Sequence, residues 1–188
     1  MDFSRKYLGK KVLITGNTGF KGSWLSAWLL HLGANVYGFS KGVPTSPSMF
    51  ESLDLEEKIT FFKGDVTDFD AVKKVVDEVA PDFIFHVAAQ ALTGLAYQQP
   101  IATLQTNVMG TAHVLECLRQ MEQPCCAIFI TSDKCYENHE WEWGYRESDQ
   151  IGGKDPYSAS KGASEIVIHS YFHSYFNKPD SQIKIASV

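Results

Sequence analysis

Three side chains in the second half of the chain have the types and spacing needed for proton transfer. Tyr157 and Lys161 stand four residues apart, so on a helix the phenol and the ammonium lie on one face. A tyrosine with a solution pKa of about 10 is a poor base at neutral pH, but a neighbouring cation favours the phenolate and lowers that pKa. Together with Ser132, which follows a predicted strand, they predict a catalytic group at one sheet edge; an ordinary surface pair is the alternative.

A glycine-rich segment near the N-terminus joins a short buried run at 11–15 to a helical pattern at 21–32. Its GxxGxxG spacing is one residue wider at the first step than the common dinucleotide-binding GxGxxG. Glycines let the backbone turn tightly and approach a pyrophosphate, which then lies on the free N–H groups of the helix N-terminus. A tight turn without a ligand is the alternative. The predicted cofactor-binding residues of this segment are Gly16, Thr18, Gly19, Phe20, Lys21 and Gly22.

Two further segments follow predicted strands where a dinucleotide would place its adenosine. The acidic residue that usually holds the ribose 2′-hydroxyl is replaced by Ser40, which could hydrogen-bond, and Lys41, which could favour a 2′-phosphate. These residues alone therefore leave NAD and NADP open. Asp65, followed by Val66, could contact the adenine amino group or cap the next helix.

The elements that must position these residues alternate between strand and helix along the whole chain. An amphipathic helix is expected at 21–32, with Trp24 and Trp28 at helical spacing. Long stretches at 40–58 and 135–155 are expected to be ligand-holding loops. This alternation predicts an α/β, Rossmann-type, doubly wound parallel sheet with helices on both faces. The expected strands lie at 11–15, 35–39, 60–63, 82–86, 125–130 and 183–188, and the other helices at 68–79, 100–120 and 156–176.

The composition is that of an ordinary globular protein and excludes several classes. The 188 residues carry a net charge of −5, which argues against a nucleic-acid partner. The longest apolar stretch, 24–32, is broken by Ser26 and His31, so no membrane span is expected, and the N-terminus does not resemble a secretory signal. We therefore expect a cytoplasmic location. Without a CxxC pair, the cysteines are expected to be reduced structural thiols and not a metal site: Cys117, Cys125, Cys126 and Cys135.

Six longer strings extend these motifs into a resemblance that runs from about residue 10 to the end. They are TGNTGFKGSWLSAWL (15–29), HVAAQ (86–90), TNVMGT (106–111), TSDKCYEN (131–138), WGYRESD (143–149) and DPYSASKG (155–162). With the glycines, the serine and the Tyr–Lys pair, they resemble the extended short-chain dehydrogenase/reductase superfamily and, within it, the CDP-glucose 4,6-dehydratase family. The resemblance implies that residues 1–188 are an NAD-binding Rossmann domain whose C-terminal substrate domain is missing.

The resemblance also implies a reaction and roles for the catalytic residues. CDP-glucose would lose water to give CDP-4-keto-6-deoxyglucose, with a hydride passing from carbon 4 to NAD and back to carbon 6. Tyr157 would take the proton of the 4-hydroxyl, Ser132 would hydrogen-bond that oxygen, and Lys161 would hold the ribose. Asp133 would protonate the departing 6-hydroxyl, which requires burial or a hydrogen bond that raises its pKa.

Lys134 separates this chain from the relatives that act on dTDP-glucose, which carry a glutamate there as the carbon-5 base. A lysine is a base only if burial deprotonates it; otherwise it orients a water or another base. An ordinary salt-bridging partner in a loop is a further possibility for Asp133 and Lys134.

Several other residues have competing interpretations. By the resemblance, Asn107 bends its helix around a water, and the backbone of Ala88, Ala89 and Gln90 lines the cofactor; a solvent-facing Asn107 is the alternative. His86 is expected to be a core histidine. The aromatic residues of the second long loop are expected to stack on a nucleotide base or to pack within the loop, and Arg146 is undecided: Trp141, Trp143 and Tyr145.

The helices at 100–120 and 156–176 resemble those that form the family's dimer interface, so a homodimer is expected. The resemblance further implies deoxysugar biosynthesis for a lipopolysaccharide O-antigen. The alternative functions are another NAD(P)-dependent sugar-nucleotide dehydratase or 4-epimerase, and a truncated module that binds a dinucleotide without turnover.

Overall fold

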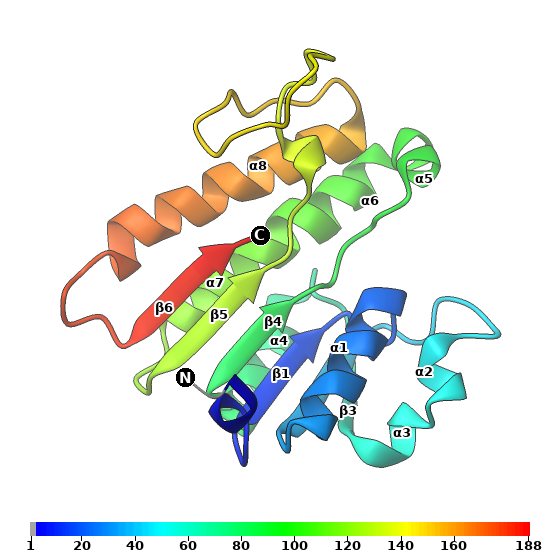
Figure 1. Ribbon diagram of the computed structural model, residues 1–188, viewed down its shortest axis with the longest axis vertical. Helices are drawn as coiled ribbons and strands as arrows, with labels where there is room; N and C mark the ends of the chain where they lie inside the picture. The colour runs from blue at the N-terminus through cyan, green and yellow to red at the C-terminus, as the bar shows by residue number, and fades with distance from the viewer. Residues whose placement is uncertain (1–2) are drawn as a thin grey trace.

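One six-stranded parallel sheet organises the protein, in the order β3-β2-β1-β4-β5-β6 (Figure 1). The computed structural model describes residues 3–188, so Met1 and Asp2 of the predicted domain lie outside the described residues. The strand order reverses between β1 and β4, which is the arrangement of a Rossmann fold and confirms the predicted fold class. The strands are β1 Lys11–Thr15, β2 Asn35–Ser40, β3 Thr60–Lys63, β4 Phe83–His86, β5 Cys125–Phe129 and β6 Ile183–Ser187.

Helices connect successive strands on both faces of the sheet. The main ones are α1 Phe20–His31, α4 Phe69–Val79, α6 Pro100–Leu104, α7 Gly110–Arg119 and α8 Pro156–Tyr171. Two π-helical segments, Gln105–Met109 and Phe172–Phe176, continue α6 into α7 and extend α8, so the two long predicted helices are present but not uniformly α-helical. The short elements are a 3₁₀ turn at Phe3–Lys6, α2 Met49–Ser52, α3 Leu55–Lys58, α5 Thr93–Gln98 and a 3₁₀ turn at Asp133–Cys135.

The core is divided by the sheet because successive strand residues point to opposite faces. On β1, Val12 and Ile14 pack in the cluster that includes Leu29 of α1, whereas Leu13 packs in the larger cluster on the other face. That larger cluster contains buried side chains from α4, α7 and α8: Val72, Val76, Val114, Leu115, Leu118 and Ile168. One helix therefore covers one face of the sheet and three cover the other.

The orientation of α1 differs from the expected one. Trp24 and Trp28 are 53% and 54% exposed, while Ser23 and Ser26 are fully buried. The buried hydroxyls are satisfied within the chain, because Ser23 Oγ donates to Asn17 O (3.1 Å) and Ser26 Oγ donates to the carbonyl one turn earlier (2.8 Å). Small side chains let the helix approach the sheet closely, so the amphipathic interpretation predicted the helix but not the face that it buries.

The first predicted long loop, 40–58, is not wholly irregular, since it contains α2 and α3. Ser48 begins α2 with a capping box: its Oγ accepts from the Glu51 N–H, and the Glu51 carboxylate accepts from the Ser48 N–H. The second loop, 135–155, contains only the short 3₁₀ turn at its start and an isolated bridge between Tyr136 and Ile151. Within the described residues, no helix has the length and apolar character needed to cross a bilayer.

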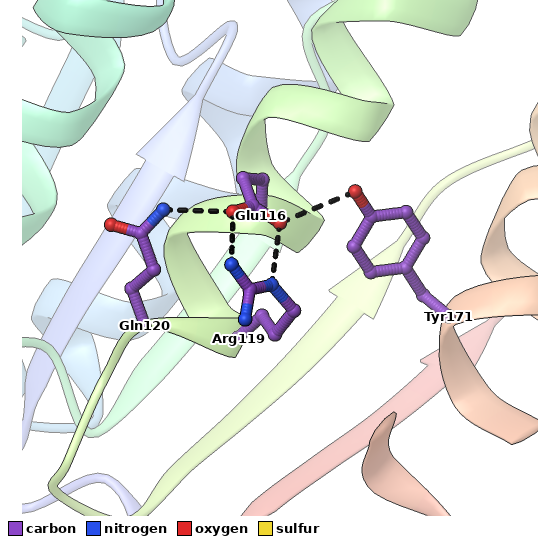
Figure 2. Close-up of polar contacts among 4 residues, drawn as sticks. All are labelled: Glu116, Arg119, Gln120 and Tyr171. Carbon is purple, nitrogen blue, oxygen red and sulfur yellow. Dashed lines mark hydrogen bonds and ion pairs between the residues drawn. The ribbon is translucent and has the colours of Figure 1, made fainter. Parts of the chain in front are cut away.

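A polar cluster joins α7 to α8 on the face of the sheet that carries the larger core cluster (Figure 2). The Glu116 carboxylate accepts from the Arg119 guanidinium (2.6 and 2.7 Å), the Gln120 amide (2.8 Å) and the Tyr171 hydroxyl (3.4 Å). The Arg119 hydrogen bond is the main reason that the pKa of Glu116 falls to about 2. The Tyr171 bond therefore links the C-terminal turns of α7 and α8.

Candidate active site

A cavity of about 480 Å³ lies where the glycine-rich segment meets the carboxyl ends of β1 to β4. We refer to it as the glycine-loop cavity. Parallel strands that reverse order leave a crevice at this edge, which is where open α/β sheets bind ligands. Among the predicted cofactor residues it is lined by Gly16, Thr18, Gly19, Phe20, Lys21, Gly22, Ser40, Asp65, Val66, Ala88 and Ala89.

Two glycines shape this cavity through close backbone approaches. A Cβ on Gly16, which has φ +74°, would lie 2.7 Å from the Cα and N of Ala88. A Cβ on Gly22 would lie 2.2 Å from the Gly16 carbonyl oxygen. Any side chain at either position would therefore push the loop away from β4 or from the start of α1, and the glycines allow the cavity to form.

The N-terminus of α1 opens into the cavity without a side-chain cap in the described residues. Gly19 is its N-cap and has no side chain to supply an acceptor, so the first N–H groups of the helix are left for a ligand. These groups and the helix dipole favour an anion such as a diphosphate. The donors and the cavity volume therefore fit a dinucleotide.

Asp65 and Lys41 form an ion pair at the far end of the cavity, with Lys41 Nζ 2.8 Å from Asp65 Oδ2. Asp65 Oδ1 accepts from the Thr67 N–H (3.0 Å). Burial alone would raise the pKa of Asp65, but the hydrogen bonds from Lys41 and Thr67 hold it below its ordinary value. The helix-capping alternative for Asp65 is wrong, because Asp68 is the residue that caps α4 and accepts from the Ala71 N–H (3.1 Å).

Lys161 lies beneath the carboxyl end of β5 and is 6% exposed. Its Nζ donates to the Ile130 carbonyl (3.1 Å), two residues before Ser132. Burial first, and the Lys21 ammonium second, lower the pKa of Lys161 to about 8. The bond to Ile130 brings the first turns of α8 against the strand end that carries Ser132.

Tyr157 occupies the first turn of α8, where Pro156 and Asp155 fix the start of the helix. Asp155 Oδ1 accepts from the N–H groups of Tyr157 (2.9 Å) and Ser158 (3.0 Å). The Tyr157 side chain is half-buried, and its hydroxyl makes no hydrogen bond within residues 3–188. The phenol is therefore held by its helix with its oxygen left for a substrate.

Ser132 caps the 3₁₀ turn at Asp133–Cys135. Its Oγ accepts from the Lys134 N–H (3.2 Å) and donates to Asp133 Oδ1 (3.0 Å). Asp133 and Lys134 are both exposed. A protonated Asp133 or a neutral Lys134 was expected to be buried. The described residues do not bury either side chain. Both side chains line a second cavity, of about 360 Å³, between the 135–155 loop and α8.

Asn107 is 2% exposed, so the solvent-facing alternative is wrong. Its Oδ1 accepts from the Gln90 N–H (2.8 Å), and its Nδ2 donates to Gln90 O (3.0 Å) and Ser160 Oγ (2.8 Å). The helix around it is π-helical, and the Asn107 carbonyl accepts from the Thr111 and Ser164 hydroxyls. Asn107 therefore connects the end of β4 to the turn of α8 that follows Tyr157.

His86 is a core histidine, as expected. It is 3% exposed, with Nδ1 2.8 Å from Thr15 Oγ1 and Nε2 3.2 Å from Thr111 Oγ1. Burial, with a smaller contribution from the Lys161 charge, lowers its pKa to about 3. The ring is neutral at physiological pH and joins β1 to α7.

The aromatic residues of the 135–155 loop pack on one another. Tyr136 stacks on Tyr145 with ring centroids 5.5 Å apart, and Trp141 stacks on Trp143 at 5.3 Å. The aromatic side chains therefore pack within the loop. The Arg146 backbone forms a turn with Asp149: its N–H donates to the Asp149 carboxylate (2.7 Å), and its carbonyl accepts from the Asp149 N–H (2.9 Å).

The structure separates the predicted site residues into two groups. Gln90, Asn107, Tyr157 and Lys161 do not line the glycine-loop cavity, although the bonds of Asn107 and Lys161 tie them to its edge. Sequence reasoning missed Gly42, Pro44 and Thr106 as lining residues. The Thr18 hydroxyl donates to Gly42 O (2.7 Å), a contact between distant segments that no local pattern indicates. No group of three potential metal ligands occurs within residues 3–188.

The chain is similar to proteins whose names describe enzymes that act on sugar nucleotides. A sequence model described as GDP-mannose 4,6 dehydratase matches residues 13–178. The chain is 50% identical over 169 residues to CDP-glucose 4,6-dehydratase of Salmonella typhimurium, covering 90% of this chain and 47% of that protein. It is 30% identical to CDP-paratose 2-epimerase of Salmonella typhi, covering 86% and 52%. The chain thus spans about half the length of the curated relatives it matches.

Solved structures agree with the fold. An epimerase from Methanothermobacter thermautotrophicus superposes with a TM-score of 0.82 at 30% identity, covering 100% of this chain and 53% of that one. UDP-glucose 4-epimerase of Thermus thermophilus, solved in complex with NAD, gives 0.79 at 27% identity, covering 94% and 53%.

Proposed function

Since the chain belongs to the GDP-mannose 4,6-dehydratase family, we propose that residues 1–188 are the NAD-binding domain of a longer enzyme that dehydrates CDP-glucose to CDP-4-keto-6-deoxyglucose. The observation that carries the substrate assignment is the 50% identity to the CDP-glucose dehydratase of Salmonella typhimurium. The Ser132, Tyr157 and Lys161 arrangement supports the same chemistry, because Tyr157 and the buried Lys161 lie one turn apart on α8 and Lys161 bonds to the strand end that leads to Ser132.

The glycine-loop cavity is the proposed dinucleotide site. The N–H groups at the start of α1 would bind the diphosphate, and the ends of β2 and β3, with Ser40 and Asp65, would hold the adenosine. The bound NAD supplies the hydride acceptor for carbon 4 of the sugar and the hydride donor for carbon 6.

Tyr157 and Ser132 would act together on the sugar's 4-hydroxyl. A deprotonated Tyr157 would accept the 4-hydroxyl proton and become a neutral phenol, and Ser132 Oγ would donate a hydrogen bond to the sugar oxygen as it becomes a ketone. The Ser132 hydroxyl donates a hydrogen bond to the Asp133 carboxylate in the described structure. It must therefore rotate before it can donate to the substrate. With a pKa of about 8, Lys161 is mostly protonated at neutral pH and would donate hydrogen bonds to the nicotinamide ribose.

Asp133 and Lys134 are the proposed residues of the elimination. The 4-ketone acidifies the proton on carbon 5, and Asp133 donates a proton to the departing 6-hydroxyl. Lys134 removes the carbon-5 proton or orients the group that does so. Since both side chains are exposed, we propose that the remainder of the enzyme buries them over the second cavity.

A homodimer in the cytoplasm is the proposed state. Large apolar side chains remain exposed along the two long helices: Ile101, Leu104, Met109 and Ile166. A surface of this kind is typical of an interface. Light scattering at micromolar concentration tests the dimer, and a monomer would contradict it. The relative's CDP-sugar chemistry also supports a place in deoxysugar biosynthesis for O-antigen.

The decisive experiment is mass spectrometry of the complete enzyme with NAD and a panel of CDP-, dTDP-, GDP- and UDP-sugars. Loss of one water from CDP-glucose alone is expected. Loss of water from another nucleotide sugar would retain the chemistry and contradict the CDP assignment. Asp133→Asn distinguishes a dehydratase, which it stops, from a 4-epimerase, which needs no acid there. NAD binding without turnover of any sugar would indicate a binding module.

A further inference from the structure

Thr131, the residue before Ser132, is joined to α8 by a side-chain hydrogen bond. Its hydroxyl donates to the Glu165 carboxylate. Its backbone N–H donates to the Val188 carbonyl (2.7 Å), and that carbonyl is a more distant acceptor for the hydroxyl, at 3.3 Å. The backbone of Thr131 is thus fixed to the end of β6, and its side chain is fixed to α8 through Glu165.

Glu165 follows the two predicted catalytic residues of α8 at a regular interval. Tyr157, Lys161 and Glu165 are four residues apart, so successive side chains lie one helical turn apart on one face. Lys161 Nζ donates to the Ile130 carbonyl (3.1 Å), and Glu165 accepts from the Thr131 hydroxyl. Two consecutive residues after β5 are therefore fastened to two consecutive turns of α8, immediately before the catalytic serine.

Glu165 also acts on the charge of Lys161. Burial and the Lys21 ammonium lower the pKa of Lys161 to about 8, whereas Glu165 and Cys135 act in the opposite direction. Burial raises the pKa of Cys135 to about 11 and lowers the pKa of His86, which also interacts with Lys161, to about 3. Both groups are uncharged at neutral pH. Glu165 is therefore the member of this set whose negative charge favours the ammonium form of Lys161.

We propose that Glu165 is a positioning residue of the active site, which holds Ser132 in place through Thr131 and stabilises the ammonium form of Lys161. The inference rests on the proposed roles of Ser132 and Lys161 in the dehydration. Neither effect requires Glu165 to touch the substrate. The anchoring effect needs an acceptor for the Thr131 hydroxyl, whereas the electrostatic effect needs a negative charge, so substitutions can separate the two.

The electrostatic effect is tested with Glu165→Gln in the complete enzyme. The amide oxygen can still accept from the Thr131 hydroxyl, but the charge is lost. The titration of Lys161, followed by NMR of ¹³C-labelled lysine side chains and assigned with Lys161→Arg, should move to lower pH by about half a pH unit. The single-turnover rate at pH 7 should fall by less than about threefold, because most of the lysine stays protonated.

The anchoring effect is tested with Thr131→Val, which removes the hydroxyl and leaves the charge of Glu165. The single-turnover rate should fall by about tenfold, because Ser132 is no longer held at a fixed distance from α8. The titration of Lys161 should stay at its wild-type position. Thr131→Ser retains the hydroxyl and should restore most of the rate. If Thr131→Val fails to fold, Glu165→Asp replaces it, since it keeps the charge and shortens the reach.

A matched control is Glu78→Gln, which removes an exposed carboxylate from α4 and should change neither measurement. Two results would overturn the proposal. One is a Glu165→Gln enzyme in which Lys161 titrates as in the wild type, and the other is a Thr131→Val enzyme with the wild-type rate. A wild-type enzyme that does not dehydrate CDP-glucose would instead contradict the proposed function, and the titration of Lys161 would still test the effect of Glu165.

Discussion

The two halves of the proposed site are built in different ways. Around the glycine-rich segment, backbone atoms define the cavity: Gly16 lies close to Ala88, Gly22 lies close to Gly16, and the first N–H groups of α1 have no side-chain cap. Around Ser132, side chains supply the chemistry, and two of them, Asp133 and Lys134, are exposed. The first half is therefore complete within the described residues, and the second is only partly enclosed.

This difference suggests that binding and turnover can be separated. A site made of backbone donors and strand ends forms as soon as the sheet folds. A site that needs a carboxyl and an ammonium out of water needs a cover, because burial is what changes the protonation of such groups. Substitutions in each half should then have distinct effects.

Tyr157→Phe in the complete enzyme is expected to separate turnover from NAD binding most strongly. Loss of the phenol oxygen removes the proposed base, and proton transfer by a positioned side chain contributes roughly a thousandfold to rate. Single-turnover rates should fall by that factor. The ring remains, so the dissociation constant of NAD, measured by calorimetry, should change less than about threefold. A variant that loses NAD affinity by the same factor as turnover would contradict the separation of binding from turnover.

Acidification should act on both halves together through His86, which joins β1 to α7. Its folded pKa of about 3 lies below the unfolded value of 6.5, so the unfolded chain binds one more proton between these pH values. Stability from this group is therefore complete above pH 6.5 and is lost as the pH falls towards 3. Between pH 7 and pH 4.5 the loss should be about 3 kcal/mol in urea unfolding.

His86→Gln should remove that part of the pH dependence, whereas His139→Gln, in the exposed loop, should leave it unchanged. An unaltered pH profile in His86→Gln would show that other groups set the acid stability.

The backbone nature of the first half is tested by Gly22→Ala. The new Cβ would meet the Gly16 carbonyl oxygen at 2.2 Å, so the loop must move away from α1. NAD affinity should fall by about a hundredfold, and unfolding free energy should fall by about 2 kcal/mol. Gly94→Ala is the matched control, because its Cβ would meet nothing within 4 Å. Wild-type NAD affinity in Gly22→Ala would contradict a cavity shaped by the glycines.

The sequence predicted the fold through features that are local. All six strands were expected close to their observed positions, because each is a short apolar run between turn residues. The face of α1 was not predictable in this way. Trp24 and Trp28 dominate the apolar pattern, yet Ser23 and Ser26 are the residues that α1 buries against the sheet. Small side chains are needed there because the glycine-rich segment holds the helix close to the strands.

The candidate site was predictable where a motif lies in one segment. The glycines and the Tyr157–Lys161 pair were both read from spacing. The Lys41–Asp65 pair was not, because it joins two strand ends that are neighbours only after the sheet has formed. The self-packing of the loop aromatics likewise depends on how the loop closes on itself.

The π-helical segment Gln105–Met109 has a consequence for how this chain tolerates insertions and deletions. Each α-helical residue advances the helix by about 100°, and a π-helical turn takes up one additional residue without changing the axis. Deleting one residue from 105–109 would therefore return the segment to α-helical geometry and leave Val114, Leu115 and Leu118 facing the sheet. A deletion inside α7 has no such segment to absorb it and would rotate the residues on one side of it by about 100° relative to those on the other. A one-residue deletion at 105–109 should therefore lower the free energy of unfolding less than one within α7.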